Sequence, residues 1–171
     1  CCWAMERFRG ADNWFEIIDA TNGYGLPCFI VNLWSPWFPV LVSGSGCHLD
    51  PAVAMNRALT EAAQSRLAII SGTRESIPEQ VYLLQHVRQE RPDPPDPDRP
   101  VRSFRRYPDG AGERIGDDLD RVACRVRDVT GREPLVVDLG RGYDGIAVAK
   151  VVAPGLRFEA AHGLIERAPA R

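Results

Sequence analysis

Hydrophobic positions cluster in short runs along the first fifty residues of the chain. Apolar runs at 14–20, 27–33 and 38–43 predict three β-strands. Gly and Asn between the first two runs supply the residues that a turn requires. The following segment Ser43–Gly46, with the sequence SGSG, is interpreted as a flexible joint that leads into a helix.

The pattern changes to a helical one after this joint. Ala and Leu dominate 51–70, which predicts a long helix. Asp50 is suited to the N-cap, and Gly72 is suited to the left-handed residue that ends a helix. A second helix is expected from the capping box formed by Ser76 and Glu79.

The second half of the chain begins with a segment that disfavours regular structure. Residues 91–113 are rich in Pro and Arg, and we interpret them as a flexible loop. A helix is predicted over 117–129, followed by strands at 135–138 and 146–153. The residues expected to face inward from that helix are Leu119, Val122 and Val126. The succession of strands and helices predicts an α/β (α+β) fold, a mixed β-sheet packed with helices.

Composition narrows the class of protein. A chain of 171 residues with 44% hydrophobic residues has the size and composition of one soluble domain, so 1–171 is expected to be a single domain. The net charge of −2 gives no reason to expect nucleic acid as a partner. The apolar run 27–42 is interrupted by Asn, Ser and Pro, so we expect no membrane span and a cytoplasmic location.

The cysteines and the one histidine beside them offer little catalytic signal. Five cysteines show no metal-binding spacing, and we interpret them as mostly buried, reduced thiols. Cys47 and His48 are adjacent, but neighbours on an extended segment point to opposite sides, which disfavours a dyad. Cys47 is therefore expected to be buried, and His48 to have a structural or substrate-positioning role. An arginine-rich cluster at 102–107 is interpreted as part of a solvated loop, with peptide or nucleic-acid contact as the alternative.

Polar residues at helical spacing on the long helix are the strongest functional signal. Arg57, Glu61 and Gln64 are spaced by four and three residues, so they share one stripe. A carboxylate beside an amide oxygen suits Mg²⁺, which prefers hard oxygen ligands and substrate phosphates. The alternative is a surface ion pair between Arg57 and Glu61, worth a few tenths of a kcal/mol, about 0.3.

The segment around this stripe resembles a motif of the YcaO family. That motif reads approximately G-x-G-x-H-x-D-P-x-x-A-x-x-R-A-L-T-E-A-x-Q-S-R-L, followed by a Gly-x-Arg-acid stretch. The matching residues are Gly44, Gly46, His48, Asp50, Pro51, Ala54, Arg57 to Glu61, Gln64 to Leu67, Gly72, Arg74 and Glu75. Upstream, 19–27 looks like the family's D-x-T…G-x-P hairpin, and downstream 137–139 and 151–156 look like its closing strands.

The resemblance implies a chemistry and a set of site residues. YcaO enzymes use ATP and Mg²⁺ to phosphorylate the oxygen of a peptide amide, so that a side chain or external sulfide replaces it and gives an azoline or a thioamide. By this resemblance Glu61 and Gln64 belong to the nucleotide and Mg²⁺ site, with Arg66 and Arg74 as phosphate contacts. His48 and Arg57 would position the substrate, a peptide or protein.

The sequence also departs from the family pattern. The family has an S-x-x-E-x-x-E-R motif well upstream of the D-x-T hairpin, whereas eighteen residues precede Asp19 here and none forms that motif. We therefore expect a chain truncated at its N-terminus. This sequence does not end in the Pro-rich tail of azoline-forming family members. That difference favours thioamidation with a TfuA-like partner. Two alternatives stay open: a non-catalytic YcaO-like module that binds a peptide or partner protein, and a homodimer.

Overall fold

The computed structural model describes residues 1–21, 23–72, 90–94, 98, 100–107, 109–140 and 145–156. Contacts divide the chain into two compact units, one of Cys1–Asn22 with Leu26–Ala111 and one of Gly23–Gly25 with Gly112–Arg171. The expectation of a single domain over 1–171 stays a prediction. The helix predicted from Ser76 lies outside the described residues.

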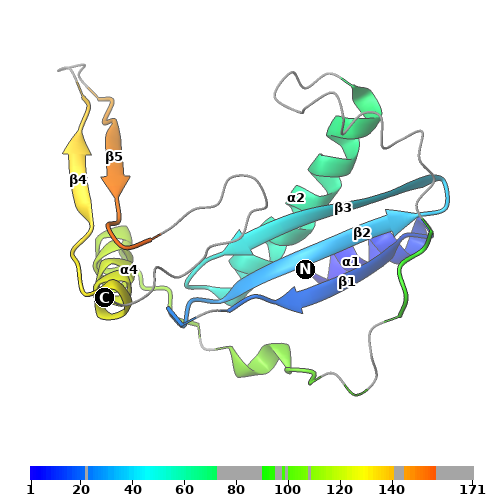
Figure 1. Cartoon of the computed structure of the whole chain (residues 1–171), viewed down its shortest axis with the longest axis horizontal. Helices are drawn as coiled ribbons and strands as arrows, with labels where there is room; N and C mark the ends of the chain where they lie inside the picture. Colours follow the sequence, from blue (N-terminus) through cyan, green and yellow to red (C-terminus); the bar gives the residue numbers. More distant parts are fainter. Residues whose placement is uncertain are drawn as a thin grey trace. The chain divides into compact units, whose positions relative to one another are not determined.

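The first unit is built on a three-stranded antiparallel sheet (Figure 1). Its strands β1 (Trp14–Asp19), β2 (Cys28–Ser35) and β3 (Phe38–Cys47) lie in the order β1-β2-β3. Each strand is hydrogen-bonded to the next one along the chain, as in consecutive hairpins. The three predicted strands are confirmed, and the third extends four residues further than the sequence pattern indicated.

The prediction of a flexible joint at Ser43–Gly46 is wrong, because these residues belong to β3. A Cβ atom on Gly44 would lie 2.1 Å from the backbone nitrogen of Ala62, and one on Gly46 would lie 2.0 Å from the Ala54 carbonyl oxygen. The two glycines are therefore required for close packing of strand against helix rather than for flexibility.

Helix α2 (Pro51–Ser71) covers one face of this sheet (Figure 1). The Asp50 side chain accepts hydrogen bonds from the N–H groups of Ala52 and Val53, and Gly72 ends the helix at φ 63°. The predicted helix and both of its ends are confirmed. Three alanines one turn apart face the sheet without exposure, which lets β3 approach the helix axis; they are Ala54, Ala58 and Ala62.

The hydrophobic core lies between α2 and alternate residues of the sheet. Phe29, Val31 and Leu33 of β2 are buried at every second position, which is the period of a strand with one covered face. Helix α1 (Cys2–Gly10), which the sequence pattern did not indicate, adds the Phe8 ring against Phe15 of β1 at 5.6 Å.

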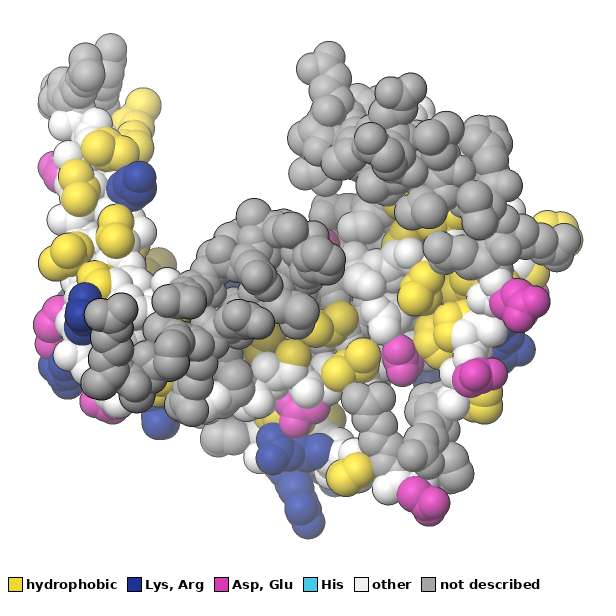
Figure 2. All heavy atoms as spheres, viewed as in Figure 1, with side chains coloured by type: hydrophobic (Ala, Val, Ile, Leu, Met, Phe, Trp, Pro, Cys, Tyr) yellow, Lys and Arg dark blue, Asp and Glu magenta, His cyan; other side chains and the backbone are white. Residues whose placement is uncertain are grey.

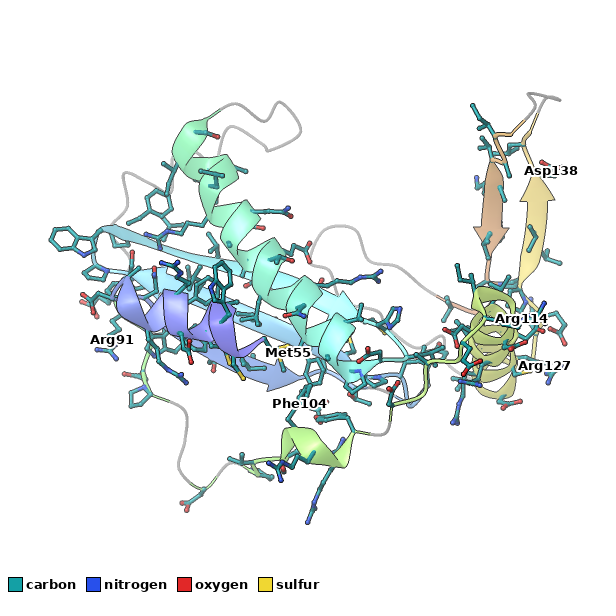
Figure 3. The ribbon with its side chains drawn as sticks, turned by 180° about the vertical axis from the view of Figure 1, so that it is seen from behind. Met55, Arg91, Phe104, Arg114, Arg127 and Asp138 are labelled. Atoms are coloured by element: carbon teal, nitrogen blue, oxygen red, sulfur yellow. The ribbon has the colours of Figure 1, made fainter. Side chains whose placement is uncertain are left out.

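Residues 100–107 of the Pro- and Arg-rich segment belong to the first unit and pack on its core. They include the short helix η2 (Phe104–Arg106), and the rings of Phe104 and Tyr107 lie 5.9 and 5.0 Å from the ring of Phe29. Phe104 and Met55 are both labelled in Figure 3, which views the unit from behind. The arginines that the structure describes in this segment up to residue 107 are exposed, as expected for a solvated surface, while its aromatic rings pack on the core.

The second unit contains α4 (Ile115–Thr130) and a hairpin of β4 (Leu135–Asp138) and β5 (Ala149–Val152). The predicted helix and first strand are confirmed, and the second strand is shorter than predicted. Leu119 was expected to face inward, but 61% of it is exposed because no described element covers that side of α4. Hydrophobic side chains also lie on the surface of the hairpin (Figure 2).

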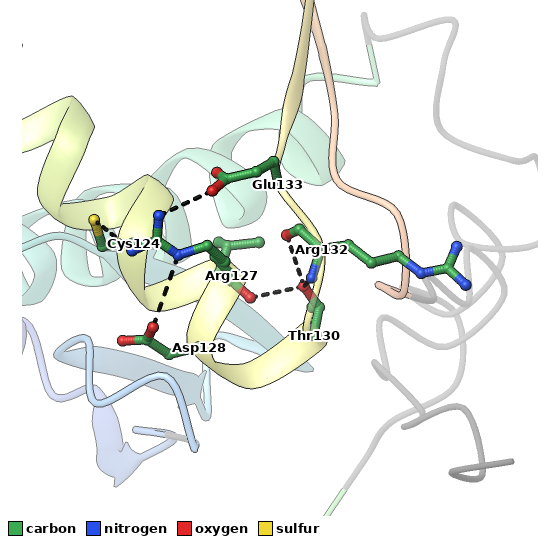
Figure 4. A network of polar contacts seen from close by, with 7 residues as sticks. Cys124, Arg127, Asp128, Thr130, Arg132 and Glu133 are labelled. Atoms are coloured by element: carbon green, nitrogen blue, oxygen red, sulfur yellow. Dashed lines mark hydrogen bonds and ion pairs between the residues drawn. The ribbon is translucent and has the colours of Figure 1, made fainter.

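A polar network joins the end of α4 to the start of β4 (Figure 4). Arg127 Nη1 donates to Glu133 Oε1 at 2.9 Å, and its Nε lies 4.0 Å from Asp128 Oδ1. Thr130 Oγ1 donates to the Val126 carbonyl and accepts from the Arg132 N–H. These contacts fix the connection around Gly131, which has a φ of 69°.

Candidate functional site

Glu61 lies against the outer edge of β3. Because His48 N–H bonds to the Pro27 carbonyl, alternate residues of β3 bond to β2, and the backbone groups of Ser45 and Cys47 point away from it. Glu61 Oε2 accepts a hydrogen bond from Ser45 N–H at 2.7 Å and one from Ser45 Oγ at 3.2 Å. The edge strand thereby fixes one oxygen of this carboxylate.

Arg57 contacts the same edge one turn earlier. Its Nη1 donates to the Cys47 carbonyl at 3.5 Å, at the limit of a hydrogen bond. Among the ion pairs of the described residues, none joins Arg57 to Glu61. The surface ion pair considered as the alternative is therefore not formed there, and both side chains instead contact polar groups of the β3 edge.

Gln64 completes the predicted stripe on the exposed side of α2. It follows Glu61 by three residues, so the two side chains leave the helix on neighbouring positions of one face. Among the described residues, none donates a hydrogen bond to Glu61 Oε1. A carboxylate oxygen and an amide oxygen are hard donors of the kind that Mg²⁺ prefers.

This donor set fits Mg²⁺ only in part. Within the described ranges, no group of three or more His, Cys, Asp or Glu side chains could hold a metal ion. Mg²⁺ demands six oxygen ligands and commonly takes several from water and substrate phosphates. Glu61 and Gln64 could therefore supply two of the ligands, and the others would come from phosphate, water or further protein groups.

Arg66 points away from the Glu61 stripe. Its guanidinium group donates to Ser35 Oγ and lies 5.3 Å from the centroid of the Phe38 ring, at the β2–β3 turn. Burial lowers the pKa of Arg66 from its usual value, and its Nη1 is buried without a partner in the described part of the chain. Arg66 is thus a partly desolvated cation separate from Glu61, and Arg74 lies outside the described residues.

His48 shapes the beginning of α2. Its Nδ1 accepts a hydrogen bond from the Asp50 N–H at 3.0 Å, directly before the helix. This contact agrees with a structural role and leaves the disfavoured dyad with Cys47 without support. The predicted burial of Cys47 is wrong, because its side chain is exposed on the sheet face that α2 does not cover. All five cysteines are described and none is buried, so the expectation of mostly buried thiols is also wrong.

Asp19 forms a second polar cluster that the sequence pattern did not reveal. Its Oδ2 lies 3.0 Å from Arg102 Nη1, and its Oδ1 accepts from the Thr21 N–H at 3.0 Å. Burial opposes ionisation, but hydrogen bonds from Tyr107 and Thr21, with the charge of Arg102, lower the pKa of Asp19 overall. The D-x-T motif pointed to Asp19 and Thr21, but the Arg102 contact spans 83 residues and has no local signal.

A cavity of about 730 Å³ adjoins this cluster. It lies between β1 and the segment 100–107, and its lining includes Glu16, Asp19, Met55 and Arg102. Met55 and Phe104, which also line the cavity, are labelled in Figure 3. The cavity thus offers both apolar and charged groups, on the part of the unit that the arginine-rich segment contacts.

Comparison with known proteins identifies the family. A family model described as YcaO cyclodehydratase, binding ATP and Mg²⁺, matches residues 1–157. The chain belongs to the YcaO family. The YcaO chain is also similar to two heterocyclase structures: one in complex with substrate and cofactor, at 27% identity and a TM-score of 0.71, and the heterocyclase TruD, at 25% and 0.70. It covers 21% and 23% of those chains, which cover 91% and 96% of it.

Uncharacterized proteins of two bacteria are also relatives of this YcaO chain. One from Mycobacterium tuberculosis is 35% identical in an alignment that covers 92% of this chain and 36% of the relative. One from Rhizobium leguminosarum, described as a protein in the tfuA 3′ region, is 30% identical over 90% of this chain and 39% of its own length. The chain therefore spans little more than a third of these relatives. A mixed fold of helices and antiparallel sheets, as predicted, is common to this chain and its structural neighbours.

No helix in the described ranges is long and apolar enough to cross a membrane.

Proposed function

We propose that this YcaO chain contributes to ATP- and Mg²⁺-dependent activation of a peptide backbone amide. The observation that carries the proposal is the geometry of Glu61: the edge of β3 fixes Oε2 of this exposed side chain, and the equally exposed Gln64 follows one helical turn later on the same face. In metal sites, carboxylates that bind the ion are commonly held in position by hydrogen bonds from other protein groups. The family match and the heterocyclase with substrate and cofactor support the same reading.

The chemistry explains why such a site is needed. Amide oxygen is a poor leaving group, and phosphorylation by ATP converts it into a good one. Negative charge spreads over the phosphoryl group during transfer, so metal ions and cations stabilise the transition state. In this proposal Glu61 and Gln64 hold Mg²⁺ when it is bound, and Arg74 contacts phosphate. Arg66, which packs on Ser35 and Phe38 at the β2–β3 turn, is no longer assigned to the phosphates. Arg57 and His48 position the peptide substrate.

The product of the reaction is a finer part of the proposal. Replacement of the activated oxygen by a Cys, Ser or Thr side chain would give an azoline, and replacement by external sulfide would give a thioamide. The name of the Rhizobium leguminosarum relative, a protein in the tfuA 3′ region, supports thioamidation with a TfuA-like partner protein. A cytoplasmic location and a homodimer are proposed as compatible with this role.

Calorimetry with Mg·ATP tests the proposal on the chain itself. Glu61→Gln keeps an oxygen that can accept from Ser45 N–H but removes the charge, so the fold should persist. Loss of a metal ligand should weaken binding of Mg·ATP by at least about tenfold, since even supporting residues cost that much. Glu6→Gln, at an exposed glutamate of α1, is the matched control and should bind as the unmodified chain does.

Calorimetry also distinguishes the catalytic proposal from a non-catalytic peptide-binding module. Equal affinity of Glu61→Gln and the unmodified chain would contradict the site assignment. A chain that binds no Mg·ATP but captures a peptide would favour the non-catalytic module instead.

A further inference from the structure

Cys28 and Cys47 are opposite each other across the β2–β3 ladder. The adjoining residues Pro27 and His48 share a backbone hydrogen bond of 3.1 Å, so the cysteines occupy a non-hydrogen-bonded position. Cα atoms of such a pair are about 4.5 Å apart. This separation is within the range of about 4.4–6.8 Å that disulfides bridge. A bond between the two sulfur atoms would therefore require little movement of the backbone.

The two thiols share the sheet face that α2 does not cover. Both are free, Cys47 is exposed, and Cys28 is half-buried. The ladder register places their side chains next to each other on this face. A soluble oxidant can therefore reach Cys47, and Cys28 is already its nearest sulfur neighbour.

The surroundings divide the roles of the two thiols. A hydrogen bond from the Cys28 thiol lowers the pKa of Cys47 to about 7, against the effect of burial and with help from the charge of Arg57. The same hydrogen bond raises the pKa of Cys28, and burial and the Asp19 carboxylate act in the same direction. One thiol is thus ionised to a substantial fraction at neutral pH while the other keeps its proton, as in an attacking and a resolving cysteine.

We propose that Cys28 and Cys47 form a redox-active dithiol site, which a low-molecular-weight disulfide oxidises to a cross-strand disulfide. The Cys47 thiolate attacks one sulfur of the oxidant, forms a mixed disulfide and releases the first thiolate. The Cys28 thiol loses its proton to solvent and attacks the Cys47 sulfur, which expels the second thiolate. Two protein thiols are oxidised, the small disulfide is reduced to two thiols, and the protons end on those leaving groups.

The site lies next to the strand segment that holds Glu61 but does not depend on nucleotide binding. Ser45, whose N–H fixes Glu61, precedes Cys47 by two residues, and Arg57 contacts the Cys47 carbonyl. Oxidation would therefore cross-link β3 to β2 at the end of the edge that carries the candidate site.

Disulfide mapping on the full chain tests this proposal directly. The chain is incubated with oxidised and reduced glutathione at pH 7, remaining thiols are blocked, and peptides are identified by mass spectrometry. The expected result is a Cys28–Cys47 linked peptide that reduced glutathione reverses, with Cys1, Cys2 and Cys124 recovered as blocked thiols. Stable glutathione adducts on Cys28 and Cys47 without a bond between them, or bridges to the other cysteines, would overturn it.

Thiol kinetics provide a measurement that no folding defect of a variant can mask. Cys47 in the unmodified chain should react with a small disulfide about threefold faster at pH 7 than an unperturbed thiol, since its larger thiolate fraction outweighs its lower nucleophilicity. Arg57→Gln should slow this step, while Arg105→Gln, at an exposed arginine of η2, should leave it unchanged. A rate that neither substitution alters would contradict the role given to Arg57.

Discussion

Single side chains at the edge of β3 combine structural and chemical roles. Glu61 Oε2 satisfies the Ser45 N–H that an edge strand would otherwise leave to solvent, and Arg57 does the same for the Cys47 carbonyl. Occupying one oxygen in this way orients the other without neutralising the carboxylate. A residue that holds the fold and a residue that binds metal can therefore be the same glutamate.

The ionisation of Asp19 should make the stability of the chain depend on pH. Its pKa is lowered in the folded chain, so its contribution to stability is complete above the ordinary aspartate pKa of about 3.9 and is lost as the pH falls through the lower folded value. Asp19→Asn should be less stable than the unmodified chain at pH 7. The difference in free energy of unfolding should narrow as the solution is acidified towards pH 2, roughly.

Urea unfolding at several pH values measures this difference. Asp109→Asn is the control, because Asp109 contacts the Ala111 N–H within its own loop rather than Arg102. A stability difference between Asp19→Asn and the unmodified chain that is constant with pH would contradict the assignment.

At the scale of elements, packing of β3 on α2 decides where the site residues lie. Gly44 and Gly46 face Ala62 and Ala54, so strand and helix backbones almost touch. Gly44 lies against the helical turn from Ala58 to Ala62, and Gly46 against the preceding turn. This packing places Glu61 beside Ser45. The glycines thus determine the geometry of the polar stripe without carrying any functional group themselves.

Gly46→Ala should therefore destabilise the first unit. The new Cβ would meet the Ala54 carbonyl and the Ala58 nitrogen, which are helix backbone and cannot move aside alone. Overpacking of this kind costs about 1–3 kcal/mol, and a backbone contact belongs at the upper end. Gly10→Ala is the matched control, because nothing lies within 4 Å of its added Cβ. Equal thermal stability of the two variants would show that strand and helix are less tightly packed than described.

The N-cap of α2 provides a second stability prediction. Asp50 accepts from the N–H groups of Ala52 and Val53, so Asp50→Ala leaves both donors without that partner. The expected loss is about 1 kcal/mol of unfolding free energy. Asp50→Asn keeps a capping oxygen and should recover most of it. An Asn variant as unstable as the Ala variant would contradict the capping role.

Signals from neighbouring residues in the sequence predicted where these elements begin and end, but they did not predict how the elements pack. Asp50, Gly72 and the Ala-rich pattern located α2 because capping, left-handed glycine and helical period are properties of neighbouring residues. The glycines of β3 were misread for the same reason: a local pattern cannot distinguish a flexible glycine from one against a helix backbone. The exposure of Leu119 was missed because burial depends on what else covers the helix.

At the scale of the whole molecule, the candidate site combines residues predicted from sequence with contacts that sequence could not supply. The family motif named Glu61, Gln64 and Arg66, and the structure places Arg66 apart from Glu61. The Asp19–Arg102 contact and the Cys28–Cys47 pairing join residues distant in sequence. Such pairings depend on strand register and on docking of the arginine-rich segment, which have no local signature.

Thermal unfolding during a titration with Mg·ATP tests the central claim most directly. If Glu61 and Gln64 form part of a metal–nucleotide site, ligand at 100 times its dissociation constant should stabilise the chain by about 2.7 kcal/mol. The rise in melting temperature should require both ATP and Mg²⁺ and should disappear in Glu61→Gln. No rise in the unmodified chain, or the same rise in Glu61→Gln, would contradict the account.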